Sequence, residues 1–223
     1  MPNLTKIDTI AGIPIYAVKG HPPSFLYLAG MTIDADGSPR CYGPNNSGID
    51  HTANGGTPGD NWWGGPTDAG GYPLIQKIYD PHPGFYVSAT AHFDPVHPES
   101  SPYRYLDSER IPFIVLPGGH SNGAKLGDVC LCLNTKTGDN CYGIYGDVGP
   151  GNKLGEASMR MAHALKIDNN PKTGGTESKH VAYLVFPGSI GEWVAPSIWF
   201  HMAHELFQAW GNLDKLRMLL EEM

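Results

Sequence analysis

Two carboxylates lie on either side of a glycine- and proline-rich turn in the second half of the chain. Asp147 follows an apolar run, and Glu156 comes nine residues later, at the start of a segment with helical periodicity. Hydrolysis of a glycosidic bond needs a protonated carboxyl that assists the leaving oxygen and an ionised one that acts on water or on the sugar. We therefore predict that residues 142–165 form a strand, a turn and a helix that turn both acids toward one groove. The alternative is that Asp147 caps the turn and Glu156 stabilises the first helical turn.

Two further carboxylates, Asp34 and Asp36, follow the apolar run 25–33 in the sequence Asp-Ala-Asp-Gly. The pattern begins like a calcium-binding EF-hand loop, but Pro39 and Asn45 stand where that loop needs a glycine and an acidic ligand. Two interpretations stay open: a local turn closed by an aspartate side chain, or two carboxylates at a strand end that face a cleft.

A long loop with two adjacent tryptophans comes next. Residues 42–72 are mostly Gly, Asn, Pro, Asp and Thr without periodicity, which is typical of a functional or a disordered segment, and Trp62 and Trp63 argue against disorder. An exposed indole can bind the apolar face of a sugar ring, and a buried one fastens the loop to the core; we expect burial for at least one of the pair. The residues predicted to bind substrate are Asp34, Asp36, Asp50, Trp62, Trp63 and Tyr145.

The four cysteines are Cys41, Cys130, Cys132 and Cys141. A hairpin turn centred on residues 136–137 would put Cys132 directly opposite Cys141, which predicts a Cys132–Cys141 disulfide and leaves Cys41–Cys130 as the second one. A four-thiolate zinc site is the alternative, but the spacing lacks a Cys-x-x-Cys pair.

A second metal hypothesis involves His201, His204 and Glu205 near the C-terminus. Their order matches neither the His-Glu-x-x-His motif nor its inverse, and the aromatic residues around them, such as Trp199 and Phe207, favour a packed helix. We predict no metal and no cofactor.

The pattern of apolar runs predicts a mainly β protein with a few helices (α+β) in one domain, residues 1–223. An N-terminal lobe of about residues 1–105 would pack on a catalytic core of about 106–223. Strands are expected at 7–18 (a hairpin), 25–33, 84–91, 111–117, 126–133, 141–147 and 181–186, and helices at 156–166, 197–210 and 213–223.

The net charge, the apolar runs and the first residues of the chain indicate which binding partners to expect. The formal net charge of −7 argues against nucleic acids and anionic membranes and is compatible with a cationic substrate. No apolar run is long enough to span a bilayer, and the first residues have neither the basic nor the apolar region of a signal peptide. We expect a monomer.

At Gly146-Asp147-Val148-Gly149-Pro150 and Gly155-Glu156-Ala157-Ser158 the sequence resembles the chitosanases of glycoside hydrolase family 75. The Asp-Ala-Asp-Gly segment and the Val-Leu-Pro-Gly strand end at 115–118 add to the resemblance. It implies a small six-stranded β-barrel of the double-psi, endoglucanase-V-like type, with long loops and C-terminal helices. It also implies inverting, endo-acting hydrolysis of β-1,4-glucosamine linkages in chitosan, a polycation, outside the cell, with Asp147 and Glu156 as the essential acids.

The roles of the two acids stay open on physical grounds. A helix start would favour ionised Glu156, hence a base, whereas the like charge of the nearby Asp147 could raise the pKa of Glu156 and make it the acid instead. The family resemblance implies Glu156 as general acid and Asp147 as general base. Alternative functions are a β-glucanase or other polysaccharide hydrolase on the same fold, and a non-catalytic carbohydrate-binding or expansin-like protein.

Overall fold

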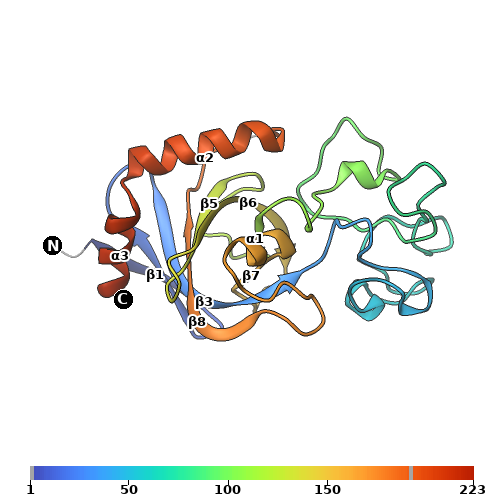
Figure 1. The fold of residues 1–223 in the computed structure, drawn as a ribbon, viewed down its shortest axis with the longest axis horizontal. Coiled ribbons are helices and arrows are strands. Elements are labelled where there is room, and N and C mark those ends of the chain that lie inside the picture. The colour runs from blue at the N-terminus through green and yellow to red at the C-terminus, as the bar shows by residue number, and fades with distance from the viewer. Residues whose placement is uncertain (1–2, 191–192) are drawn as a thin grey trace.

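The computed structural model describes residues 3–190 and 193–223 (Figure 1). Within them, eight strands form one sheet in the order β1-β2-β3-β7-β4-β6-β5-β8, and a further pairing of β3 with β8 closes the last six into a barrel. Two of the barrel pairings are parallel, β3 with β7 and β4 with β6. The strands are β1 (Leu4–Ile10), β2 (Ile13–Val18), β3 (Ser24–Asp34), β4 (Phe113–Pro117), β5 (Val129–Asn134), β6 (Asn140–Gly149), β7 (Glu156–Ser158) and β8 (Thr176–Val185).

The barrel strands β4 and β5 are buried on both faces along their whole length, which is why they appear in the sequence as continuous apolar runs. Alternate residues of β4 belong to different hydrophobic clusters, Ile114 and Leu116 to one and Phe113 and Val115 to the other. The second cluster is covered by the C-terminal helices α2 (Pro196–Trp210) and α3 (Leu213–Glu221). The expected six-stranded barrel with C-terminal helices is confirmed.

The region between β3 and β4 consists of loops, and it gathers at the end of the molecule away from α3 (Figure 1). It contains three short 3₁₀ turns, Pro44–Asn46, Thr52–Gly55 and Pro102–Arg104. At the opposite end, the Asn3 side chain donates to Glu222 Oε1 at 2.7 Å and ties β1 to α3. No helix in residues 3–190 and 193–223 combines the length and the apolar character that a bilayer crossing requires.

Two local predictions were wrong. Residues 84–91 form no strand; one isolated bridge, Ile75 with Tyr86, is formed there. Glu156 does not begin a helix: it lies in β7, and α1 (Met159–Ala164) starts three residues later, capped by the Ser158 hydroxyl, which accepts from the Met161 N–H. Pairing of β7 with β3 and β4 overrides the helical periodicity of the segment.

The predicted disulfides, Cys132–Cys141 and Cys41–Cys130, are not formed, and all four cysteines are free thiols. The expected register is correct, because Cys132 is paired with Cys141 across β5 and β6. However, the Cys141 thiol donates to the Tyr142 carbonyl oxygen at 3.2 Å, and the Cys41 thiol donates to the Asp36 carboxylate at 3.6 Å. Each of these two thiols therefore has a partner other than the expected one.

Candidate active site

Asp147 and Glu156 are brought together by the central barrel strand β4. Val115 of β4 is paired with Asp147 of β6 on one side and with Glu156 of β7 on the other, and Glu156 is also paired with Thr32 of β3. Directly paired residues project to the same face of a sheet. All four side chains line one cleft of about 550 Å³. The sequence prediction that both acids face one groove agrees with this arrangement.

A second feature of the cleft is a cluster of three carboxyls. Asp34, Asp36 and Asp147 each offer an oxygen within 4.8 Å of the others. Asp34 Oδ1 also accepts the backbone N–H of Asp36 at 2.7 Å, so both interpretations of the Asp-Ala-Asp-Gly segment hold, the local turn and the acids facing a cleft. Parallel pairing of β3 with β7 brings the two early aspartates to the two later acids.

Burial and the neighbouring carboxyls together determine the protonation of Asp147. Burial and the nearby Asp36 charge raise the pKa of Asp147 to about 8, against backbone hydrogen bonds that lower it. Burial likewise raises the pKa of Asp36 to about 6, and burial with the neighbouring Asp36 raises the pKa of Asp34 well above its usual range. At neutral pH, Asp147 is therefore mostly a neutral carboxylic acid.

Hydrogen bonds indicate which oxygen of Asp147 holds the proton. The backbone N–H groups of Ala91 and Val148 both donate to Asp147 Oδ1, each at 2.8 Å. An oxygen that accepts two N–H donors has no room for a hydrogen of its own. The proton is thus held on Oδ2.

Glu156 has the opposite environment. Its Oε1 accepts a hydrogen bond from the Lys153 ammonium at 2.7 Å, in an ion pair where the Glu156 side chain is 15% exposed and that of Lys153 is 37% exposed. A hydrogen bond between an ammonium and a carboxylate is charge-assisted and fixes the carboxylate in place. The two acids on either side of Val115 therefore have different neighbours: Asp147 lies among carboxyls, and Glu156 is paired with an ammonium.

The family comparison agrees with this site. Residues 31–199 match the model of the fungal chitosanases of glycosyl hydrolase group 75. The chain belongs to this family. The matched region contains β4, β6 and β7 and the end of β3, hence both acids and the whole carboxyl cluster. Family membership supports a glycoside hydrolase that acts on chitosan, and a comparison with curated proteins finds no match.

Of the residues predicted to bind substrate, four line the cleft of this family member: Asp34, Asp36, Asp50 and Trp63. The Trp63 side chain is 62% exposed, and its indole N–H donates to the Asn54 carbonyl at 2.9 Å. Asp50 is held by the Asn54 amide, which donates to both carboxylate oxygens at 3.0 Å.

The other two predicted substrate-binding residues do not line the cleft. Trp62 is partly buried and packs edge-on between Tyr42 and Tyr86, so it is the tryptophan that fastens the loop to the core. Tyr145 is 5% exposed, within the first hydrophobic cluster. Tyr145 and Asp147 are two apart in β6, but the register shift beside Val115 puts them on different faces.

Sequence reasoning missed two residues of the cleft. Lys153 is three residues before Glu156, a spacing that could have suggested an ion pair. Tyr42 is 2% exposed and donates its hydroxyl to Asp36, a contact across a loop that no local pattern reveals.

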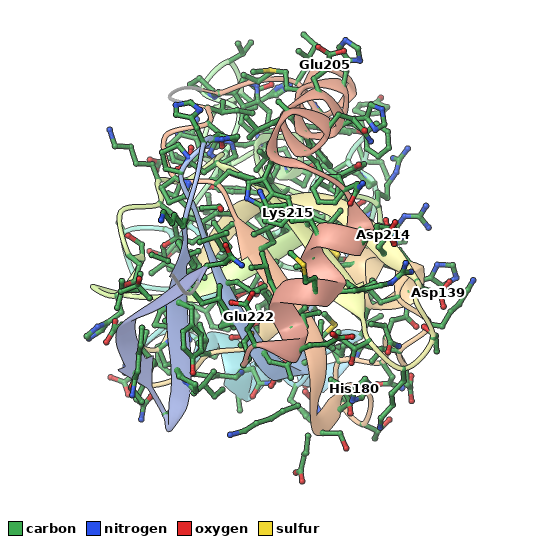
Figure 2. All side chains as sticks on the ribbon, turned by 90° about the vertical axis from the view of Figure 1, so that its left-hand side faces the viewer. Asp139, His180, Glu205, Asp214, Lys215 and Glu222 are labelled. Atoms are coloured by element: carbon green, nitrogen blue, oxygen red, sulfur yellow. The ribbon has the colours of Figure 1, made fainter. Side chains whose placement is uncertain are left out.

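The metal hypothesis at α2 gains no support. The side chains of His201 and Glu205 are 75% and 69% exposed, and Figure 2 shows Glu205 at the outer surface of α2, above α3. The ring of His204 is bonded instead to the Tyr142 hydroxyl at 3.3 Å. In the part of the chain that the structure describes, the acidic cluster has the oxygen donors that a hard cation prefers, but Asp147 Oδ1 is already occupied by two N–H groups.

Proposed function

We propose that this protein cleaves β-1,4-glucosamine linkages within chitosan chains by inversion, with Asp147 as general acid and Glu156 as general base. The observation that carries the proposal is the contrast between two carboxyls on either side of Val115, one crowded by like charges and the other paired with an ammonium. Environments that drive two acids apart in protonation assign the roles of acid and base.

In the proposed reaction, Asp147 Oδ2 gives its proton to the glycosidic oxygen as the C1–O bond breaks. Glu156 accepts a proton from a water molecule, and that water attacks C1 from the opposite face of the sugar. The cycle ends with Asp147 ionised and Glu156 protonated, and solvent returns both to their starting forms. These roles are the reverse of those expected from the family resemblance, and the electrostatics of the cleft are the reason for the change.

Strand geometry supports the inverting course. Asp147 and Glu156 are both paired with Val115, so two interstrand spacings of about 4.8 Å separate their backbones, or roughly 10 Å in all. Inverting enzymes hold their carboxyls about 6.5–9.5 Å apart to admit a water, and retaining enzymes about 5–5.5 Å.

The charge of the cleft supports a cationic substrate. Five carboxyl side chains line it, with Asp50 alongside the catalytic pair and the two early aspartates. A neutral glucan gains nothing from such groups, whereas a glucosamine ammonium is attracted by those of them that are ionised. Action on a polymer of this kind also fits an extracellular enzyme, as in the family.

The test is release of reducing ends from chitosan by wild type, Asp147→Asn and Glu156→Gln. We expect both variants to lose at least about 100-fold in kcat, the usual contribution of a general acid or base. Full activity in both would refute the proposal, and cleavage of glucan but not chitosan would refute the substrate. Proton NMR of the first product checks the inversion, because a β-linkage hydrolysed by inversion yields the α-anomer.

An aryl β-glycoside of a glucosamine oligomer separates the two roles. Its leaving group departs with little help from an acid, so Asp147→Asn is expected to recover activity on it and Glu156→Gln is not. If only Glu156→Gln regained activity on the aryl glycoside, Glu156 would be the general acid and the proposed roles would be wrong.

A further inference from the structure

Lys153 is a cation in a cleft that otherwise carries carboxyl groups. Its ammonium is 2.7 Å from Glu156 Oε1, and it is the basic side chain among the described residues that line the cleft. A cation here weakens the attraction of the cleft for a polycation. Its position therefore needs an explanation other than substrate attraction.

The backbone fixes Lys153 over the cleft. Its N–H donates to the Pro150 carbonyl at 3.1 Å, which closes the loop that follows β6. The loop ends at Gly155, whose φ is +88°; a Cβ there would stand only 2.8 Å from the Gly30 carbonyl oxygen, so no side chain fits. Both ends of the loop are thus anchored on the barrel, and Lys153 is presented next to Glu156.

The ion pair leaves one Glu156 oxygen free. Oε1 is bonded to Lys153, whereas Oε2 lies beside Gly149, 3.2 Å from where a Cβ would stand. Gly149 is two residues beyond Asp147 in β6, so Oε2 is turned across Val115 toward the strand that carries the other acid. Oε2 is therefore the Glu156 oxygen that lies toward β6.

We propose that Lys153 is a positioning residue for the hydrolysis: it holds Oε1 of Glu156 and so directs Oε2 at the attacking water. The inference rests on the proposed function, with Glu156 as the base. Lys153 touches neither sugar nor water in this scheme and acts through Glu156 alone.

Steady-state kinetics of Lys153→Met on soluble glucosamine oligomers tests the inference. We expect kcat to fall about 100-fold, because a general base contributes about that much or more, with KM changed by less than about threefold. Lys153→Arg keeps the cation and is expected to retain most of the kcat. Added ethylammonium should partly restore the kcat of Lys153→Ala. Lys125→Met, an exposed lysine outside the cleft, is the matched control.

Unchanged kcat in Lys153→Met overturns the inference, and so does a fall in KM alone, which would make Lys153 a group that merely repels substrate. Thermal melting of each variant excludes misfolding, which is not expected for a side chain that is 37% exposed. Asp147→Asn and Glu156→Gln are measured in the same assay. If those two lose activity while Lys153→Met keeps it, only the positioning role fails; if those two keep activity, the proposed function fails.

Discussion

Replacing Asp36 by asparagine should move the alkaline limit of activity toward neutral pH. Asp36 is the largest contributor after burial to the raised pKa of Asp147, and an oxygen of each lies within 4.8 Å of the other. Asparagine has the same shape and retains an oxygen that can accept from Ser88, which donates to Asp36 Oδ1 at 3.2 Å. The substitution therefore removes the charge and preserves the local contacts.

The size of the shift follows from Coulomb's law. Two unit charges 4.8 Å apart interact by about 3.5 kcal/mol at an effective dielectric constant of about 20. At about 1.36 kcal/mol per pKa unit, this energy changes a pKa by about 2.5. Asp36 itself titrates near pH 6, so it is incompletely charged where it acts, and we expect the pKa of Asp147, now about 8, to fall by about two units. About nine-tenths of Asp147 is protonated at pH 7 in the wild type, and about a tenth would be in the variant.

The assay is kcat/KM on soluble glucosamine oligomers between about pH 4.5 and 9. We expect wild type and Asp36→Asn to be similar near pH 5 and to differ about tenfold at pH 7. Both enzymes meet the same titration of the substrate amines, which therefore cancels in the ratio between them, and kcat measured alone separates the protonation of Asp147 from the contribution of Asp36 to substrate binding. Asp60→Asn removes an exposed carboxylate outside the cleft and should leave the ratio near one at every pH. An alkaline limit that stays in place, or rises, would refute Asp147 as the acid.

Three other expectations concern stability, binding and the thiols. The raised pKa of Asp147 means that the native state holds a proton that the unfolded chain has lost, so the free energy of unfolding falls as the pH rises from about 4 to about 8. Asp147→Asn should reduce this pH dependence, measured as melting temperatures at pH 5, 7 and 9. The same pH dependence in wild type and variant would contradict the prediction. Trp63→Ala should raise KM about tenfold with little effect on stability, since stacking or cation–π contact with a sugar is worth about 1–2 kcal/mol. Trp62→Ala, by contrast, should lower the free energy of unfolding by about 3 kcal/mol in a denaturant titration. Equal effects of the two variants would contradict the separate roles of a substrate-binding Trp63 and a structural Trp62. Alkylation of the denatured protein without reductant should label all four cysteines in the mass spectrum. Two or fewer labelled cysteines would show that disulfides are present.

The barrel could be predicted from the sequence because its strands carry their signal locally. The apolar runs that became β3, β4, β5 and β8 are bounded by turn residues, and both of their faces are buried. β7 was missed because its three residues have no strand signal of their own. They are held by pairing with β3 and β4, and neighbours so distant in sequence are invisible to a local pattern.

The candidate site could be predicted in its parts and not in its electrostatics. Asp147, Glu156 and the two early aspartates were identified by residue type and family resemblance. Their mutual distances depend on how β3, β6 and β7 align around the barrel. The cysteines illustrate the same limit: the register of Cys132 and Cys141 was right, but chain direction alone does not fix where each thiol points.

The proposed division of labour between the two acids depends on this long-range assembly. The helix start expected at Glu156 is not formed, and the positive neighbour of Glu156 is Lys153 instead of a helix terminus. The pKa of Asp147 is raised by burial first and then by the charge of Asp36, which β3 places beside it. A chain that kept Asp147 and Glu156 but lost either Asp36 or Lys153 would therefore retain the family motif and lose a neighbour on which the proposed role of one acid depends.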